Sequence, residues 1–123
     1  MAYEPLWERF EATAPSGVRL AVQFLRAGFL TLGDRPELYF FRLTPPADRP
    51  EAATQEIVVG LSGDALRRFQ HHRRRGLSRE EKIDVAGLLL KKSIEAGTAL
   101  DSNNLLIRDE ALAALAAELR IPE

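Results

Sequence analysis

A run of cationic side chains over residues 67–75 is the part of the sequence best suited to binding chemistry. On an α-helix, residues three or four positions apart share a face, so this run would place most of its cations on two adjoining helical faces. Such a surface can neutralise the phosphates of a nucleic acid or meet the carboxylates of a protein. The candidate binding residues are Arg67, Arg68, His71, Arg74 and Arg75.

The distribution of charge leaves three interpretations of this run open. Residues 64–92 carry nine basic and four acidic side chains, a net charge of +5, whereas residues 93–123 carry two basic and six acidic ones, a net charge of -4. The pI of about 6.2 weighs against a dedicated nucleic-acid binder, which is expected to be basic. The arginines are therefore solvated or paired within the chain, bind an acidic protein partner or a second copy, or bind nucleic acid.

Residue types suited to catalysis or metal binding are sparse. Cysteine is absent, and the only two histidines, His71 and His72, are adjacent. Neighbouring helical residues point about 100° apart, so these two cannot easily share a metal ion. Residues 60–64, Gly-Leu-Ser-Gly-Asp, depart from the nucleophile motif G-x-S-x-G at Asp64, and both histidines lie on the helix that follows. We therefore expect no metal, no cofactor and no enzymatic activity.

The composition predicts one folded domain over residues 1–123. The 46% of hydrophobic and 28% of charged residues are typical of globular proteins. No apolar run is long enough to cross a bilayer, so we expect a cytoplasmic protein with no membrane partner. Arginine outnumbers lysine fourteen to three, a bias that we take to indicate a GC-rich bacterial genome. The polar, proline-containing segment 44–54 is expected to be a mobile loop.

The sequence predicts a helix and then a strand at the N-terminal end. Residues 4–12 could form a short helix, with Leu6 and Phe10 facing inward. Residues 18–24 alternate apolar and polar side chains with a period of two, which favours a half-buried strand. A helix over residues 18–27 remains the alternative, because several apolar residues there also share a helical face.

The next elements are strands. The apolar runs 29–32 and 38–43 flank Gly-Asp-Arg-Pro at 33–36, which predicts a hairpin. The prolines at 45 and 46 should end its second strand, because proline cannot donate to a sheet. Residues 56–61 then form a buried strand.

The C-terminal half has the signals of helices. Ser62 or Asp64 can begin a helix that reaches Arg75, with Gly76 ending it in the left-handed conformation. Ser78 followed by Glu81 has the spacing of a capping box, and the helix that it begins should reach Ala96 before Gly97.

This second helix should be amphipathic. Its buried stripe is Ile83, Gly87, Leu90 and Ile94, and the opposite face is Glu80, Asp84, Lys91 and Glu95. Residues 105–107 then form a short strand, and Asp109 caps a last helix over residues 110–119.

Strands followed by helices predict an α+β fold, in which a small antiparallel sheet of three to four strands from the N-terminal half is packed by two to three helices from the C-terminal half. Five side chains should then be buried, namely Val22, Phe24, Phe40, Val58 and Leu90. The expected function is that of a small cytoplasmic accessory or regulatory protein that acts through a protein–protein surface, by binding a partner or itself. The alternative is a nucleic-acid-associated factor that uses the basic helix 67–75.

Overall fold

The computed structural model, which describes residues 8–48, 53–101 and 105–121, has an α+β fold. Four strands run antiparallel in sequence order, and a short fifth strand pairs with the fourth in parallel. The expected fold class is confirmed, with the parallel strand as an addition to the sheet. The strands are β1 (Arg9–Thr13), β2 (Arg19–Phe29), β3 (Glu37–Thr44), β4 (Gln55–Leu61) and β5 (Leu106–Ile107).

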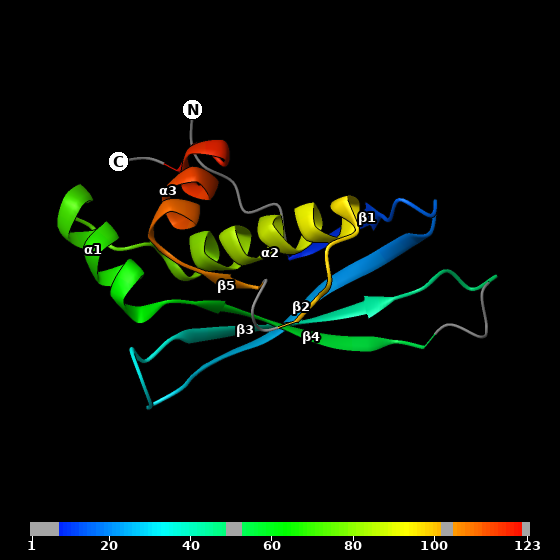
Figure 1. Cartoon of the computed structure of the whole chain (residues 1–123), viewed down its shortest axis with the longest axis horizontal. Coiled ribbons are helices and arrows are strands. Elements are labelled where there is room, and N and C mark those ends of the chain that lie inside the picture. The colour runs from blue at the N-terminus through cyan, green and yellow to red at the C-terminus, as the bar shows by residue number, and fades with distance from the viewer. Residues whose placement is uncertain (1–7, 49–52, 102–104, 122–123) are drawn as a thin grey trace.

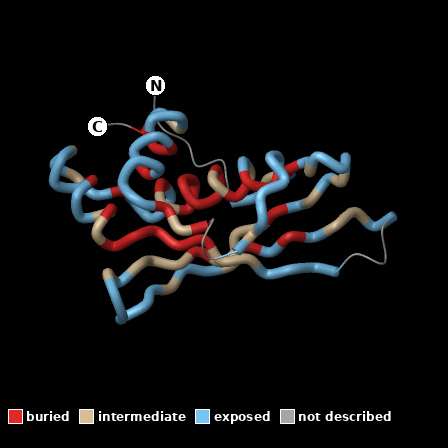
Figure 2. The backbone as a smooth tube through the Cα atoms, in the orientation of Figure 1, coloured by how far each residue is buried: buried red, intermediate tan, exposed pale blue. Residues whose placement is uncertain are grey.

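Three helices cover one face of this sheet (Figure 1). They are α1 (Gly63–Arg73), α2 (Arg79–Ala96) and α3 (Asp109–Glu118). The long helix α2 lies along the sheet, and α1 and α3 pack together near the end of β4. Figure 2 shows the buried positions concentrated between the helices and the sheet. Within the described ranges, no helix covers the other face of the sheet.

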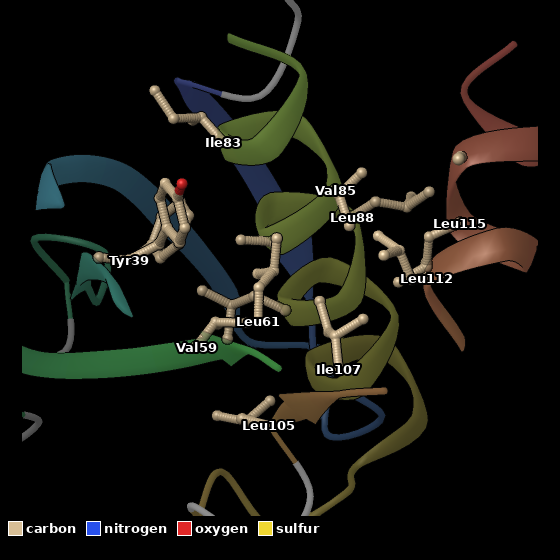
Figure 3. Close-up of a cluster of buried hydrophobic side chains, with 14 of the residues drawn as sticks. Tyr39, Val59, Leu61, Ile83, Val85, Leu88, Leu105, Ile107, Leu112 and Leu115 are labelled. Carbon is tan, nitrogen blue, oxygen red and sulfur yellow. The ribbon is translucent and has the colours of Figure 1, made fainter. Parts of the chain in front are cut away.

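Helix α2 is buried on more than one side, and this overturns part of its expected amphipathic pattern. The stripe of Ile83, Leu90 and Ile94 is buried as expected, but Asp84, which was expected on the exposed face, is also fully buried. Helix α2 has apolar neighbours on more than one side. Figure 3 shows Leu61 of the sheet on one side of it and Leu112 of α3 on another.

The burial of individual strand residues follows the two faces of the sheet. Val22 and Leu90 are buried as expected, but Phe40 and Val58 are only half-buried. These two residues are cross-strand partners on the face that the described helices leave open, whereas Tyr39 points to the helices. The expected burial of Phe40 and Val58 was therefore wrong.

Phe24 is also half-buried rather than buried. Its ring packs on Phe41 at a centroid distance of 5.7 Å, and the guanidinium of Arg79 lies 5.6 Å from the ring centroid. The ring therefore lies at the border of the core, where one side contacts the sheet and another is reached by a charged side chain. The prediction of full burial was wrong for this residue too.

The N-terminal helix expected over residues 4–12 is wrong for its described part, because Arg9–Thr13 form strand β1. Burial of Ala12 between exposed Glu11 and Thr13 has a period of two, and β2 supplies the backbone partners. Residues 4–7 lie outside the described ranges. The strand at 18–24 and the hairpin after it are confirmed, although β2 ends at Phe29 rather than at Leu32.

The second half of the chain confirms the predicted capping box. The Ser78 hydroxyl accepts a hydrogen bond from the backbone N–H of Glu81 at 3.2 Å, and a Glu81 carboxylate oxygen accepts one from the N–H of Ser78 at 2.7 Å. Helix α2 ends at Ala96, and Gly97 follows with a φ of 72°. The short strand at 105–107 is also present, as β5.

Two helix ends differ from the expected ones. Helix α1 ends at Arg73, and Arg74 rather than Gly76 is left-handed, with a φ of 58°. The early end leaves Arg75 outside the helix, where it pairs with Glu81. Helix α3 begins after Arg108, and Asp109 does not cap it, because this carboxylate pairs with Arg68. Of the loop expected over 44–54, residues 49–52 lie outside the described ranges, and its mobility stays a prediction.

Candidate binding surface

Three of the five cations singled out in the sequence are paired with carboxylates of the same chain. Arg68 binds Asp109 through two hydrogen bonds, at 2.8 Å and 2.6 Å, and so joins α1 to α3. Arg67 pairs with Asp64, three residues earlier on α1. The last of these pairs, Arg75 with Glu81, is described below. The five residues therefore do not form one uniform basic face.

The pair of Arg75 and Glu81 is the most protected of these contacts. Its two hydrogen bonds are 3.0 Å and 2.9 Å long, and the side chain of Glu81 is 6% exposed. Burial alone would raise the pKa of Glu81, but hydrogen bonds from Arg75 and from the backbone N–H of Ser78 outweigh it and lower that pKa. This pair fixes the connection between α1 and α2, so Arg75 has a structural role.

The exposed pair of Arg68 and Asp109 is electrostatically similar but reaches solvent. The hydrogen bond from Arg68 lowers the pKa of Asp109, and the same bond raises the pKa of Arg68. Their side chains are 58% and 49% exposed. Exposed pairs of this kind are screened by solvent and add little to stability, so this contact constrains Arg68 more than it stabilises the fold.

His71 and Arg74 are the two candidate residues that stay available. His71 is exposed on α1 and Arg74 is exposed just after its end, and no ion pair joins either of them to a carboxylate of the described residues. Together with Arg67 and Gln70 they line a shallow hollow. The rings of His71 and His72 have their centroids 6.3 Å apart, and no group of three metal-ligating side chains gathers anywhere in the described ranges.

The loop between β2 and β3 is the feature that the sequence did not reveal. Phe29 is 71% exposed, Leu30 48% and Leu32 79%, and these are the exposed large apolar side chains of the described residues. The apolar run 29–32 was expected to continue a strand of the sheet. Its end at Phe29 instead leaves Leu30 and Leu32 in the turn. The glycine at 33 was the available signal for an early end.

Backbone contacts hold this loop in one shape. The N–H of Leu30 donates to the carbonyl of Pro36 at 3.0 Å, and the N–H of Arg35 donates to the carbonyl of Leu32 at 3.2 Å. Arg35 is left-handed, with a φ of 58°, a conformation that is uncommon for a side chain of this kind. The apolar side chains are thus presented on an ordered turn.

Asp34 fastens the loop to the beginning of α1. Its carboxylate accepts a hydrogen bond of 2.5 Å from the hydroxyl of Ser62, which lowers the pKa of Asp34. The hydroxyl of Ser62 also accepts from the N–H of Ala65 at 3.2 Å and so caps the helix. A Cβ at Gly63 would lie 2.0 Å from the carbonyl oxygen of Asp34. Only glycine therefore lets the loop approach so closely. Residues 60–64 are the end of β4 and the start of α1, with Ser62 engaged as the helix cap.

The loop and the basic helix form one continuous surface. Arg35 lines a hollow beside Phe29 and a second hollow that Arg67 also lines. Arg67 in turn lines the hollow of His71 and Arg74. Figure 1 shows the β2–β3 turn and α1 at the same end of the molecule. We call this surface the docking end and define it as Phe29, Leu30, Leu32, Arg35, Arg67, His71 and Arg74.

A second titratable cluster, at Glu37, has a structural role. Tyr39 donates a hydrogen bond of 2.8 Å to Glu37, and the ammonium of Lys82 lies 3.0 Å from the same carboxylate. Burial raises the pKa of the Tyr39 phenol, and Glu37 adds to the effect. Tyr39 is only 3% exposed. The cluster ties β3 to α2.

Comparison with protein-family models, with curated proteins and with solved structures gave no significant match. Among the described residues, no helix combines the length and the apolar character needed to cross a bilayer. Function is therefore inferred from the geometry of this chain.

Proposed function

We propose that this chain is a small cytoplasmic accessory or regulatory protein of bacteria that acts by binding another protein at its docking end. The observation that carries the proposal is the ordered turn with Phe29, Leu30 and Leu32 in solvent, next to Arg35, a cation that no described carboxylate pairs with. Large exposed apolar groups beside polar residues are typical of interaction sites.

The apolar part of the docking end supplies affinity. Burial of a large apolar side chain against a partner contributes about 1.5–3 kcal/mol. Because Asp34 and the backbone hydrogen bonds already fix the turn, little conformational entropy is lost when a partner binds. Phe29 and Leu32, the two most exposed of these residues, are the expected anchors.

The charged part of the docking end selects the partner. No ion pair joins Arg35, His71 or Arg74 to another described residue, so these side chains can meet carboxylates without giving up an existing contact. The partner that fits is a protein segment that combines apolar side chains with aspartate or glutamate.

Nucleic acid fits this surface less well. Phosphate contacts use cations, but Arg67, Arg68 and Arg75 already bind carboxylates that an incoming phosphate would have to displace. The apolar turn would also stay in water. For these reasons we favour a protein partner and treat nucleic acid as an outcome of the test.

Selection from a random dodecapeptide library displayed on phage tests the proposal without a known partner. The wild-type protein is the bait, and we expect selected peptides enriched in Asp, Glu and large apolar residues. In fluorescence anisotropy, the dissociation constant of a selected peptide should be at least about tenfold higher for the double variant F29S/L32S than for the wild type, the effect of losing 1.4 kcal/mol. Arg74→Gln should raise the dissociation constant of the same peptide by a smaller factor. Arg42→Gln, an exposed cation of β3, is the matched control and should leave binding unchanged.

Three results would overturn the proposal. The first is a selection that yields no binding peptide. The second is a set of peptides that bind F29S/L32S as tightly as the wild type. The third is salt-sensitive binding of oligonucleotides that is lost when Arg67 and Arg74 are both changed to glutamine, which would assign the surface to nucleic acid.

A further inference from the structure

Strand β1 forms an edge of the sheet whose outer hydrogen-bonding groups have no partner among the described residues. The N–H of Phe24 donates to the carbonyl of Glu8 at 2.8 Å, and the N–H of Ala14 donates to the carbonyl of Val18 at 2.9 Å. In an antiparallel pair the hydrogen-bonded residues alternate, so the even-numbered residues of β1 face β2. The N–H and carbonyl groups of Arg9, Glu11 and Thr13 therefore point away from the sheet.

The side chains on this edge alternate in charge. Arg9 and Glu11 are exposed, and they lie on the face opposite to buried Ala12, which contacts the helices. The only partner of Glu11 in the described structure is Arg19 of β2, at 3.4 Å, in a pair whose side chains are 61% and 72% exposed. A strand edge that carries one cation and one anion two residues apart can pair antiparallel with a second copy of itself, so that each cation lies opposite an anion.

We propose that a second copy of this chain binds here, by antiparallel pairing of the two β1 strands about a two-fold axis at Phe10. In this register Arg9 lies opposite the partner's Glu11, and Glu11 lies opposite the partner's Arg9. Each of these opposed pairs exchanges two backbone hydrogen bonds. The interface thus satisfies the free backbone groups and places unlike charges in cross-strand contact.

The neighbouring registers are disfavoured by the sequence. An axis at Glu11 would place Glu11 opposite the partner's Glu11, and like charges directly opposite are destabilising. An axis at Ala12 would place Arg9 opposite the partner's Pro15, which has no N–H to donate. The charge pattern therefore selects the axis at Phe10.

This inference is independent of the proposed function. Strand β1 pairs with β2 no further along than Phe24, whereas the exposed turn begins at Phe29, and α1 follows β4 towards the other edge of the sheet. Pairing through β1 therefore uses backbone groups that the docking end does not. A dimer built in this way presents two docking ends to partners.

Charge exchange across the axis tests the register. In sedimentation equilibrium we expect the wild type to dimerise, and Arg9→Glu and Glu11→Arg each to raise the dimer dissociation constant at least about tenfold, because each single change creates two like-charge contacts. The double variant R9E/E11R restores both pairs and should return the constant to within about threefold of the wild type. Arg19→Gln removes only the intrachain pair and should leave dimerisation unchanged.

A wild type that stays monomeric would overturn the inference, as would a double variant that dissociates as much as the single ones. Thermal unfolding of each variant checks that the fold is kept. Binding of the selected peptides should be the same for Arg9→Glu as for the wild type, so this result and the test of the docking end can fail separately.

Discussion

Helices α1 and α2 are both capped at their N-termini by a serine, and the comparison of the two caps shows which contacts can be predicted from sequence. Ser62 and Ser78 each accept a hydrogen bond of 3.2 Å from the N–H three residues later. The cap at Ser78 is completed by Glu81 of the same helix, whereas Ser62 donates to Asp34, 28 residues earlier. The first arrangement is encoded in four consecutive residues, and the second exists only in the folded chain.

The two caps also have different consequences for function. Glu81 binds Arg75 as well as its cap and so removes one arginine from the basic surface. Asp34 holds the β2–β3 turn against α1 and so brings the apolar part of the docking end beside the cations. The local cap thus stabilises the fold, and the long-range cap assembles the candidate site.

Gly63→Ala should have the largest effect on stability, because it breaks the long-range contact directly. The new Cβ would lie 2.0 Å from a backbone oxygen of Asp34, so the loop or the helix must move. We expect a loss of about 3 kcal/mol in the free energy of unfolding, measured in urea, which is the upper part of the usual range for overpacking. Gly76→Ala is the control, because its Cβ would meet only the Gln70 side chain, at 3.6 Å. Equal losses for both variants would contradict this account.

Glu81→Ala should come next, with a loss of about 2–3 kcal/mol, because a buried carboxylate bonded to a charged guanidinium and to a cap is removed. Asp109→Ala breaks an exposed pair of the same type, which solvent screens, and should cost clearly less. Urea midpoints of the two variants at pH 7 give the comparison. If Asp109→Ala is the more costly one, the structural role assigned to Arg75 is wrong.

The contribution of the Glu81 carboxylate to the free energy of unfolding should depend on pH. Because the pKa of Glu81 is lowered in the folded state, its contribution is present above the ordinary glutamate pKa of about 4.3 and is lost as the pH falls below it. The difference in unfolding free energy between wild type and Glu81→Gln should therefore be largest near pH 7 and shrink on acidification. A difference that grows at low pH would contradict the assigned direction.

Replacing the two capping serines should give the smallest difference in the free energy of unfolding, with the larger loss at Ser62. Ser78→Ala removes one cap and should cost about 1 kcal/mol. Ser62→Ala removes a cap and also the donor to Asp34, so a cost of about 2 kcal/mol is expected. Chemical denaturation of both variants measures the order, and a smaller loss at Ser62 would show that the bond to Asp34 contributes nothing.

Features that depend on neighbouring residues were predicted from the sequence, and features that depend on distant residues were missed. The capping box of α2, its end at Gly97 and the hairpin after β2 depend on neighbouring residues, and all three were predicted. Strand β1 was missed, because Phe10 and its neighbours fit a helical period as well as a strand period until β2 is beside them.

Long-range partners could not be predicted in the same way. Arg68 pairs with Asp109 across 41 positions, and Asp84 is fully buried although its helical position matches the polar face of α2. The exposure of Leu32 depends on where β2 ends and on the contact that holds the turn. No local spacing encodes these facts, and the first of them removes Arg68 from the available cations of residues 67–75.

The dissociation constant of a phage-selected acidic, apolar peptide for wild type and for F29S/L32S tests the central claim most directly. Both side chains are exposed, so their loss should leave the urea midpoint of the protein unchanged. We expect the dissociation constant to rise at least about tenfold in the double variant. An unchanged constant would show that the apolar turn does not bind the partner and would contradict the assignment of the docking end.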